Sequence, residues 1–212
     1  MNGTQRGFDL ALAERELRGQ DPRLAPWFDR LGPITPDPRW REGFDTVDAL
    51  ARAILYQQLS GKAAATIVAR VEAASGRRRL TAARLDALDD ATLRTCGVSR
   101  NKLLALRDLC RHARARRVPG PRRLLAMEDE AIVEALTAVR GIGRWTVEML
   151  LIFRLGRPDV LPHGDLGIQR GLQRLCGLSA LPSPARVAEL GAGWAPWRSL
   201  ASLLLWRIAG AT

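Results

Sequence analysis

Two helical patterns meet at a short turn in residues 136–147, which read LTAVRGIGRWTV. In this turn, Gly141 and Gly143 bracket one apolar residue, Ile142. Glycine permits a positive φ and has no side chain above the backbone, so N–H groups at the start of the next helix can closely approach a phosphate. The turn can therefore grip a DNA backbone without reading its sequence. A Gly-x-Gly pair alone is equally compatible with an ordinary tight turn between helices.

Outward from this turn, the chain reads as helical almost throughout. From Asp45 onward, apolar residues recur at the i, i+3, i+4 spacing of a helix, and strand-like alternation is nearly absent. A polar break at 57–61 (QQLSG) separates two helical patterns, and Ser60 is placed to cap the second. These patterns predict an all-α fold. Further helices are expected over 99–114, 128–138, 144–154, 166–175, 184–190 and 196–208.

A second informative segment follows at 161–168, which reads LPHGDLGI. Its proline and glycine loop brings Asp165 to the start of a helix. Asp is a favoured N-cap residue whatever the function, so a purely structural role has to be weighed against a chemical one. Asp159, beside Pro158, is expected to be a turn residue, and His163 to be a loop residue or a DNA contact.

Four segments together resemble the helix-hairpin-helix DNA glycosylase superfamily, and within it the 3-methyladenine DNA glycosylase II branch. They are YQQLS (56–60), GIGRWT (141–146), GDLG (164–167) and WAPWRS (194–199). The resemblance covers about residues 45–208 and implies a two-lobed helical fold with a DNA-binding cleft between the lobes. The chain has neither the length nor the strand pattern for the N-terminal β domain of larger members, so it resembles the shorter, all-helical ones.

This resemblance suggests three regions. Residues 1–45, rich in proline, are expected to form a short helix and an irregular wrap packed on the C-terminal lobe. Residues 46–130 form a helical lobe, and residues 131–212 a lobe with the glycine turn and Asp165. The arginine-rich stretches 77–79 and 111–121 are interpreted as solvated loops.

The implied activity is flipping a damaged base out of duplex DNA and hydrolysing its bond to the sugar. Asp165 is the expected catalyst, because a carboxylate near C1′ stabilises an oxocarbenium-like state and can orient water. Family members that also cut the strand carry a lysine just after the hairpin, where this chain has Trp145; its lysines are Lys62 and Lys102. Water is therefore the expected nucleophile, and no strand cleavage at the abasic site is expected.

The resemblance also assigns the remaining site residues. Trp145 and Trp206, with Tyr56 and Met149, are expected to line the base pocket, where an indole attracts a cationic alkylated purine. Core packing is the alternative for each tryptophan, and it is preferred for Trp194 and Trp197.

The break at 57–60 falls where the family places a loop that enters the minor groove. We call it the wedge loop. Gln58, or failing that Leu59, is expected to fill the gap left by the extruded base, although an ordinary helix corner is the alternative. Phosphate contacts are expected from Gly141, Gly143, Arg144 and Thr146.

Composition fits this picture. A net charge of +11 favours a polyanionic partner, although nearly all of it comes from arginine and could reflect codon bias. Cys96, Cys110 and Cys176 lack zinc or iron–sulfur spacing and are expected to be buried thiols.

We expect no cofactor and no metal bound by side chains, leaving open a monovalent cation against carbonyls of the hairpin. The expected protein is a cytoplasmic, nucleoid-associated monomer that binds damaged double-stranded DNA and no membrane.

Two alternatives remain. One is a helix-hairpin-helix glycosylase of other specificity, for uracil, hypoxanthine or mismatched adenine; the absence of iron–sulfur cysteines disfavours the last. The other is a non-enzymatic DNA-binding module, which Asp165 argues against, because an anionic side chain gives a pure binder no advantage beside phosphate.

Overall fold

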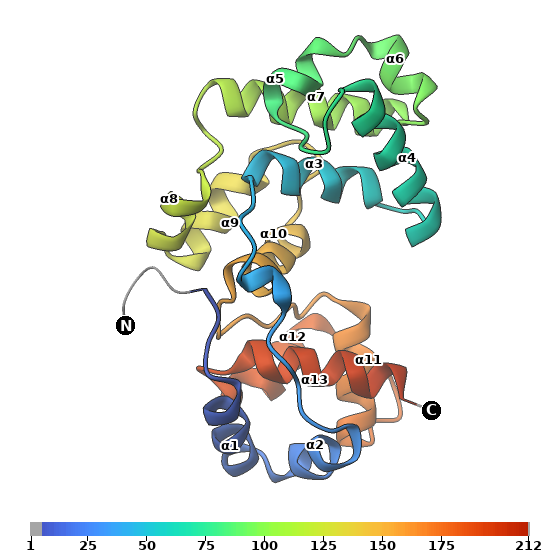
Figure 1. Ribbon diagram of the computed structural model, residues 1–212. Coiled ribbons are helices and arrows are strands. Elements are labelled where there is room, and N and C mark those ends of the chain that lie inside the picture. Colours follow the sequence, from blue (N-terminus) through green and yellow to red (C-terminus); the bar gives the residue numbers. More distant parts are fainter. Residues whose placement is uncertain (1–5, 212) are drawn as a thin grey trace. The chain divides into compact units, whose positions relative to one another are not determined.

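The computed structural model describes residues 6–211, which form helices joined by turns, with no strand among them (Figure 1). The all-α prediction is confirmed for this part of the chain. The α-helices are α1 (Leu10–Gln20), α2 (Ala25–Leu31), α3 (Thr46–Tyr56), α4 (Gly61–Ala74), α5 (Ala82–Ala87), α6 (Asp90–Thr95), α7 (Arg100–Arg114), α8 (Pro121–Ala126), α9 (Asp129–Thr137), α10 (Arg144–Leu150), α11 (Leu166–Cys176), α12 (Pro184–Gly191) and α13 (Arg198–Gly210). Shorter turns are η1 (Pro22–Leu24), η2 (Pro38–Trp40), the π-helical η3 (Leu151–Leu155) and η4 (Ala192–Trp194).

These helices gather into two compact units. Unit 1 comprises residues 43–147, and unit 2 comprises residues 6–42 together with 148–211. The expected division placed all of 131–212 in one lobe, whereas the structure groups the glycine turn (141–143) with the preceding helices. Residues 6–42 lie with the C-terminal helices, where the expected wrap ran to residue 45.

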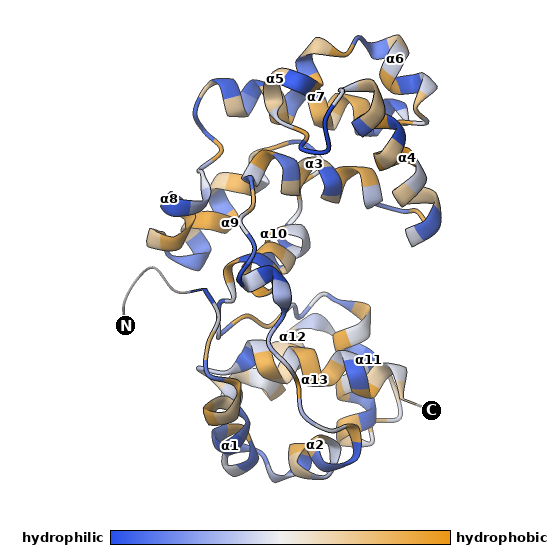
Figure 2. Cartoon of the chain, viewed as in Figure 1, coloured by the Kyte–Doolittle hydropathy of each residue, from blue (hydrophilic) through white to orange (hydrophobic). Residues whose placement is uncertain are grey.

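Unit 1 is built on α7, which packs against α3 and α5. Apolar residues at helical spacing on α7, such as Leu103, Leu106 and Leu109, are buried there with Leu50 and Ile54 of α3. Figure 2 shows helices carrying both polar and apolar segments, as expected of helices with one buried face.

The predicted loop over 111–121 begins too early. α7 continues through Arg114 and buries His112, so the loop proper starts after the helix ends. The end of the helix predicted over 99–114 is therefore confirmed, and its last turn holds a buried residue, His112, where the arginine-rich sequence was interpreted as a solvated loop.

Unit 2 is centred on α11 and α13, which lie side by side (Figure 1). Gly171 of α11 makes the approach close, because a Cβ at this position would overlap the carbonyl oxygen of Leu205. The buried residues of α1 and α2, including Leu17 and Phe28, join the same apolar core.

The N-terminal region contains two α-helices where one was expected. The prolines of 1–45 were interpreted as marking an irregular wrap, yet one of them, Pro26, lies in the first turn of α2, where its missing N–H has no partner to lose. Trp194 is fully buried and donates its indole N–H to Asp21 at 2.9 Å. Trp197 is half-buried and bonds Glu16 at 2.6 Å, so both tryptophans serve the core of unit 2, as expected.

Candidate functional site

The glycine turn presents two exposed glycines around a buried isoleucine. Gly141 adopts a φ of +79°, and a Cβ there would lie 3.2 Å from Cβ of Ala105 on α7. At Gly143 a Cβ would meet no atom within 4 Å. The first glycine is thus required by the turn itself, whereas the second leaves open space in which a phosphate could approach the backbone.

The two polar residues after the turn differ from each other. Arg144 is exposed, and its guanidinium contacts both carboxylate oxygens of Glu130 at 2.8 Å, so a phosphate would compete with this ion pair. Thr146 is only 8% exposed, and its N–H donates to the Gly143 carbonyl at 3.0 Å. Burial of the side chain does not test the phosphate contact expected at Thr146, which stays a prediction. Thr146 supports the turn from inside.

The wedge loop starts where α3 ends. Gln58 adopts a φ of +57° and is exposed, and Leu59 is 41% exposed. Ser60 caps α4 by accepting a hydrogen bond from the Ala63 N–H, as predicted. The side chain of Gln57 donates to the Gly141 carbonyl at 2.8 Å, which places the wedge loop directly beside the glycine turn.

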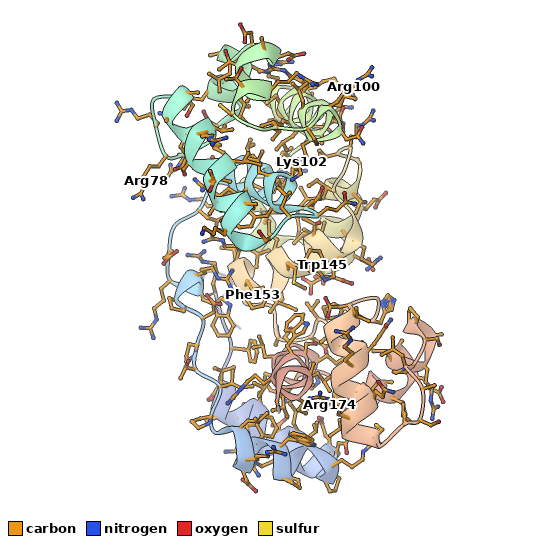
Figure 3. The ribbon with its side chains drawn as sticks, turned by 90° about the vertical axis from the view of Figure 1, so that its right-hand side faces the viewer. Arg78, Arg100, Lys102, Trp145, Phe153 and Arg174 are labelled. Carbon is orange, nitrogen blue, oxygen red and sulfur yellow. The ribbon has the colours of Figure 1, made fainter. Side chains whose placement is uncertain are left out.

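Two aromatic residues of unit 1 lie at the surface. Trp145 is 51% exposed and Tyr56 is 44% exposed. Core packing, the alternative considered for Trp145, does not account for a side chain this open. Figure 3 labels Trp145 at the start of α10.

Asp165 is fixed by two hydrogen bonds to one of its oxygens. As N-cap of α11, its Oδ1 accepts from the Ile168 N–H at 2.9 Å, and the same oxygen accepts from the indole N–H of Trp206 at 2.8 Å. Gly167 permits this arrangement, since a Cβ there would lie 2.7 Å from Cδ1 of Trp206. The carboxylate is therefore both a helix cap and the partner of a predicted pocket residue.

An aromatic column extends this cluster, and the sequence did not identify it. Phe153, labelled in Figure 3, stacks on Trp206 with ring centroids 5.7 Å apart, and the Arg39 guanidinium lies 4.4 Å from the Phe153 centroid. Arg39 in turn pairs with Asp37 at 2.6 Å, and its hydrogen bond lowers the pKa of that carboxyl. Phe153 lies in the π-helical turn η3, an irregularity that often marks functional sites but has no reliable sequence signal.

Other predicted residues have mixed outcomes. Asp159 is more than a turn residue, because it pairs with Arg198 at 2.6 Å at the start of α13. His163 is partly exposed, with a buried Nδ1 that lacks a hydrogen-bond partner among the described residues, and Met149 is partly buried.

The cysteines are all free thiols. Cys96 and Cys110 are buried and Cys176 is partly so. Burial raises the pKa of the Cys110 thiol to about 12, which leaves it protonated and a poor ligand. Within residues 6–211, no three His, Cys, Asp or Glu side chains gather as a metal site would require.

The predicted site residues divide between the units. Tyr56, Gln58, Leu59, the glycine turn and Trp145 belong to unit 1, and Met149, Asp165 and Trp206 belong to unit 2. In the described part of the chain, no helix is long and apolar enough to cross a membrane.

Comparison with known proteins gives consistent results. Residues 51–196 match the family described as HhH-GPD superfamily base excision DNA repair protein. DNA-3-methyladenine glycosylase 1 of Schizosaccharomyces pombe is 34% identical over 199 residues, which cover 93% of this chain and 87% of that protein.

Two solved structures share the fold over most of their length. The Schizosaccharomyces pombe 3-methyladenine DNA glycosylase in complex with abasic DNA has a TM-score of 0.84 at 33% identity, covering 94% of this chain and 97% of that one. A DNA-3-methyladenine glycosidase from Bacillus halodurans also has a TM-score of 0.84, at 34% identity, covering 94% and 89%.

Proposed function

The chain belongs to the HhH-GPD superfamily of base excision DNA repair proteins, and from that premise we propose that it is a DNA glycosylase that excises alkylated bases. The observation that carries the proposal is Asp165, a carboxylate held in place by the Ile168 N–H and the Trp206 indole. A group fixed in advance needs no reorganisation when charge develops, which is how preorganised sites stabilise transition states.

The proposed reaction breaks the bond between C1′ of the sugar and the base nitrogen. The bonding electrons leave with the base, and positive charge develops on the sugar, where Asp165 stabilises it. Water then attacks C1′ and transfers a proton to the carboxylate. The products are the free base and an intact strand with an abasic site.

The proposed substrates are cationic methylpurines, such as 3-methyladenine and 7-methylguanine, in duplex DNA bound by a monomer. A cationic base is already a good leaving group and is attracted to indole faces. The predicted aromatic residues Trp145 and Trp206 would supply such faces. Hydrolysis of the bond between base and sugar requires only a carboxylate and water, so we propose a reaction without cofactor. A monovalent cation at the hairpin and the cytoplasmic location stay predictions.

We also propose that the enzyme lacks strand-cleaving activity. Trp145 follows the glycine turn where a Schiff-base lysine would be needed, and Lys102 has its amine bonded to the Leu55 carbonyl at 2.7 Å. Borohydride should therefore trap no protein–DNA adduct, and product strands should stay uncut until treated with alkali. A trapped adduct would require another amine, with Lys62 the first to test.

The decisive experiment is incubation of the protein with methylated duplex DNA, followed by chromatography of the released bases. We expect 3-methyladenine and 7-methylguanine to be released. Faster release of uracil or hypoxanthine would assign another specificity, and DNA binding without any release would indicate a non-enzymatic module.

A further inference from the structure

One side of α7 contacts both segments of unit 1 that are expected to touch DNA. Lys102 donates to the Leu55 carbonyl in the last turn of α3, just before the wedge loop. Six residues further along α7, Asp108 accepts a hydrogen bond from the Arg140 N–H at 2.8 Å, just before the glycine turn. Ala105, between them, is the residue against which Gly141 packs.

The charges of Lys102 and Asp108 suit the backbone groups that they bind. The ammonium of Lys102, labelled in Figure 3, lies at the C-terminal end of α3, where the helix dipole favours positive charge. Burial lowers the pKa of Lys102. Asp108 has its pKa lowered although burial acts in the opposite direction, because the Arg140 N–H and Arg111 stabilise the carboxylate. α7 therefore holds the entry to each segment through a charge-assisted hydrogen bond.

Gln57 connects the two segments directly. It is the C-cap of α3, and its side-chain Nε2 donates to the carbonyl of Gly141 at 2.8 Å. The next residue, Gln58, is the exposed wedge candidate with a positive φ. The wedge loop and the glycine turn are thus linked by one side chain within a single unit.

From this geometry we infer that Gln57 is a positioning residue that couples the grip of the glycine turn on phosphate to insertion of the wedge at Gln58 and Leu59. The inference rests on the proposed function. Gln57 bonds a backbone carbonyl, so it acts through the turn. Two elements that must engage one duplex at once need their spacing held to a fraction of an ångström, and a direct hydrogen bond between them provides that.

The test compares Gln57→Ala with a matched control. Gln20→Ala removes a similar surface bond, since Gln20 donates its side-chain amide to the Ala195 carbonyl at 3.0 Å in unit 2. Each variant is assayed for affinity to undamaged duplex, for single-turnover release of 7-methylguanine, and for base extrusion using 2-aminopurine fluorescence next to the lesion.

For Gln57→Ala we expect extrusion and release each to fall roughly 3- to 10-fold, the effect of one hydrogen bond, with affinity for undamaged DNA changed less than about 2-fold. A lesion in a mismatched pair should restore most of the lost rate, because its extrusion is easier. Gln20→Ala should behave as wild type throughout. Gln57→Glu, which keeps the length but cannot donate to the carbonyl, should repeat the loss and serves if the alanine variant fails to fold.

Equal activity of Gln57→Ala and wild type would overturn the inference, as would an equal loss on paired and mismatched lesions. Failure of the proposed function would give a different result, because the wild-type protein itself would then release no base. In that case the fluorescence and binding measurements still test the coupling.

Discussion

In unit 1, Trp145 and Leu59, two side chains expected to meet DNA, are exposed, and the backbone behind them is anchored through Lys102, Asp108 and Gln57. In unit 2, Asp165 and Trp206 are partly buried and hold each other by a hydrogen bond. The difference separates two tasks. A surface proposed to adapt to DNA keeps its side chains exposed and fixes its backbone, whereas the proposed chemical group is fixed at the side chain itself.

The largest expected effect follows from Asp165→Asn. It removes the charge proposed to stabilise the transition state, so base release should fall by at least about 100-fold, while DNA affinity stays equal or improves slightly as one repulsion with phosphate is lost. Single-turnover assays beside equilibrium binding measure both. An Asn variant that excised bases at near wild-type rate would leave Asp165 as a helix cap only.

Gly143→Val tests the glycine turn in unit 1. The added side chain meets open space within the protein, so folding should be little affected, but it occupies the place where a phosphate must approach. We expect roughly 10-fold weaker binding to damaged and undamaged duplexes alike, the effect of losing a charge-assisted contact. Gly193→Val, also in open space, is the control. Normal binding by the Gly143 variant would move the phosphate grip elsewhere.

The two tryptophans sharpen the comparison. Trp145→Leu should slow excision of cationic methylpurines by roughly 2- to 30-fold, the range of a cation–π contact, and affect neutral lesions less. Trp206→Leu removes the hydrogen bond to Asp165 as well, so it should slow release of every base. Competition assays with 7-methylguanine and hypoxanthine distinguish the two. Parallel losses in Trp145→Leu would mean that this indole does not recognise charge.

The smallest effect concerns Asp21 in the core of unit 2. A hydrogen bond from Arg23, helped by the Trp194 indole, lowers the pKa of Asp21 below the ordinary 3.8 even though burial opposes this. The stabilisation is complete above the ordinary value and is lost as the pH falls through the folded-state pKa. Urea unfolding at pH 3 to 6 should show a steeper acid loss for wild type than for Asp21→Asn, by on the order of 1 kcal/mol. Identical slopes would show that Asp21 contributes no such pH dependence.

The sequence predicted most of the longer helices, the glycine turn and the loop before Asp165 because these depend on local patterns. Apolar periodicity defined α7 and α11, and glycine and proline marked the turn and the loop before Asp165. For Asp165, the cap and the proposed chemical role were treated as competing interpretations. The structure shows that capping leaves room for a second partner, since Oδ1 accepts from both Ile168 and Trp206.

What the sequence missed depends on contacts between distant segments. Gln57 contacts Gly141 and Phe153 stacks on Trp206, and no local pattern around either residue indicates its partner. Helix α2 was missed for a different reason, because proline ends a helix in its interior but suits its first turn. The unit boundary at Val147 falls inside α10, where a continuous helical pattern carries no sign of division.

The close approach of α11 and α13 at Gly171 has a consequence for how the protein should respond to heat. Because the backbones meet with no side chain between them, neither helix can shift without disrupting the core that both share. The Asp165 and Trp206 pair, carried by these helices, should therefore persist until unit 2 unfolds as a whole. Loss of activity on warming should coincide with melting of unit 2, with no earlier loosening of the Asp165 carboxylate.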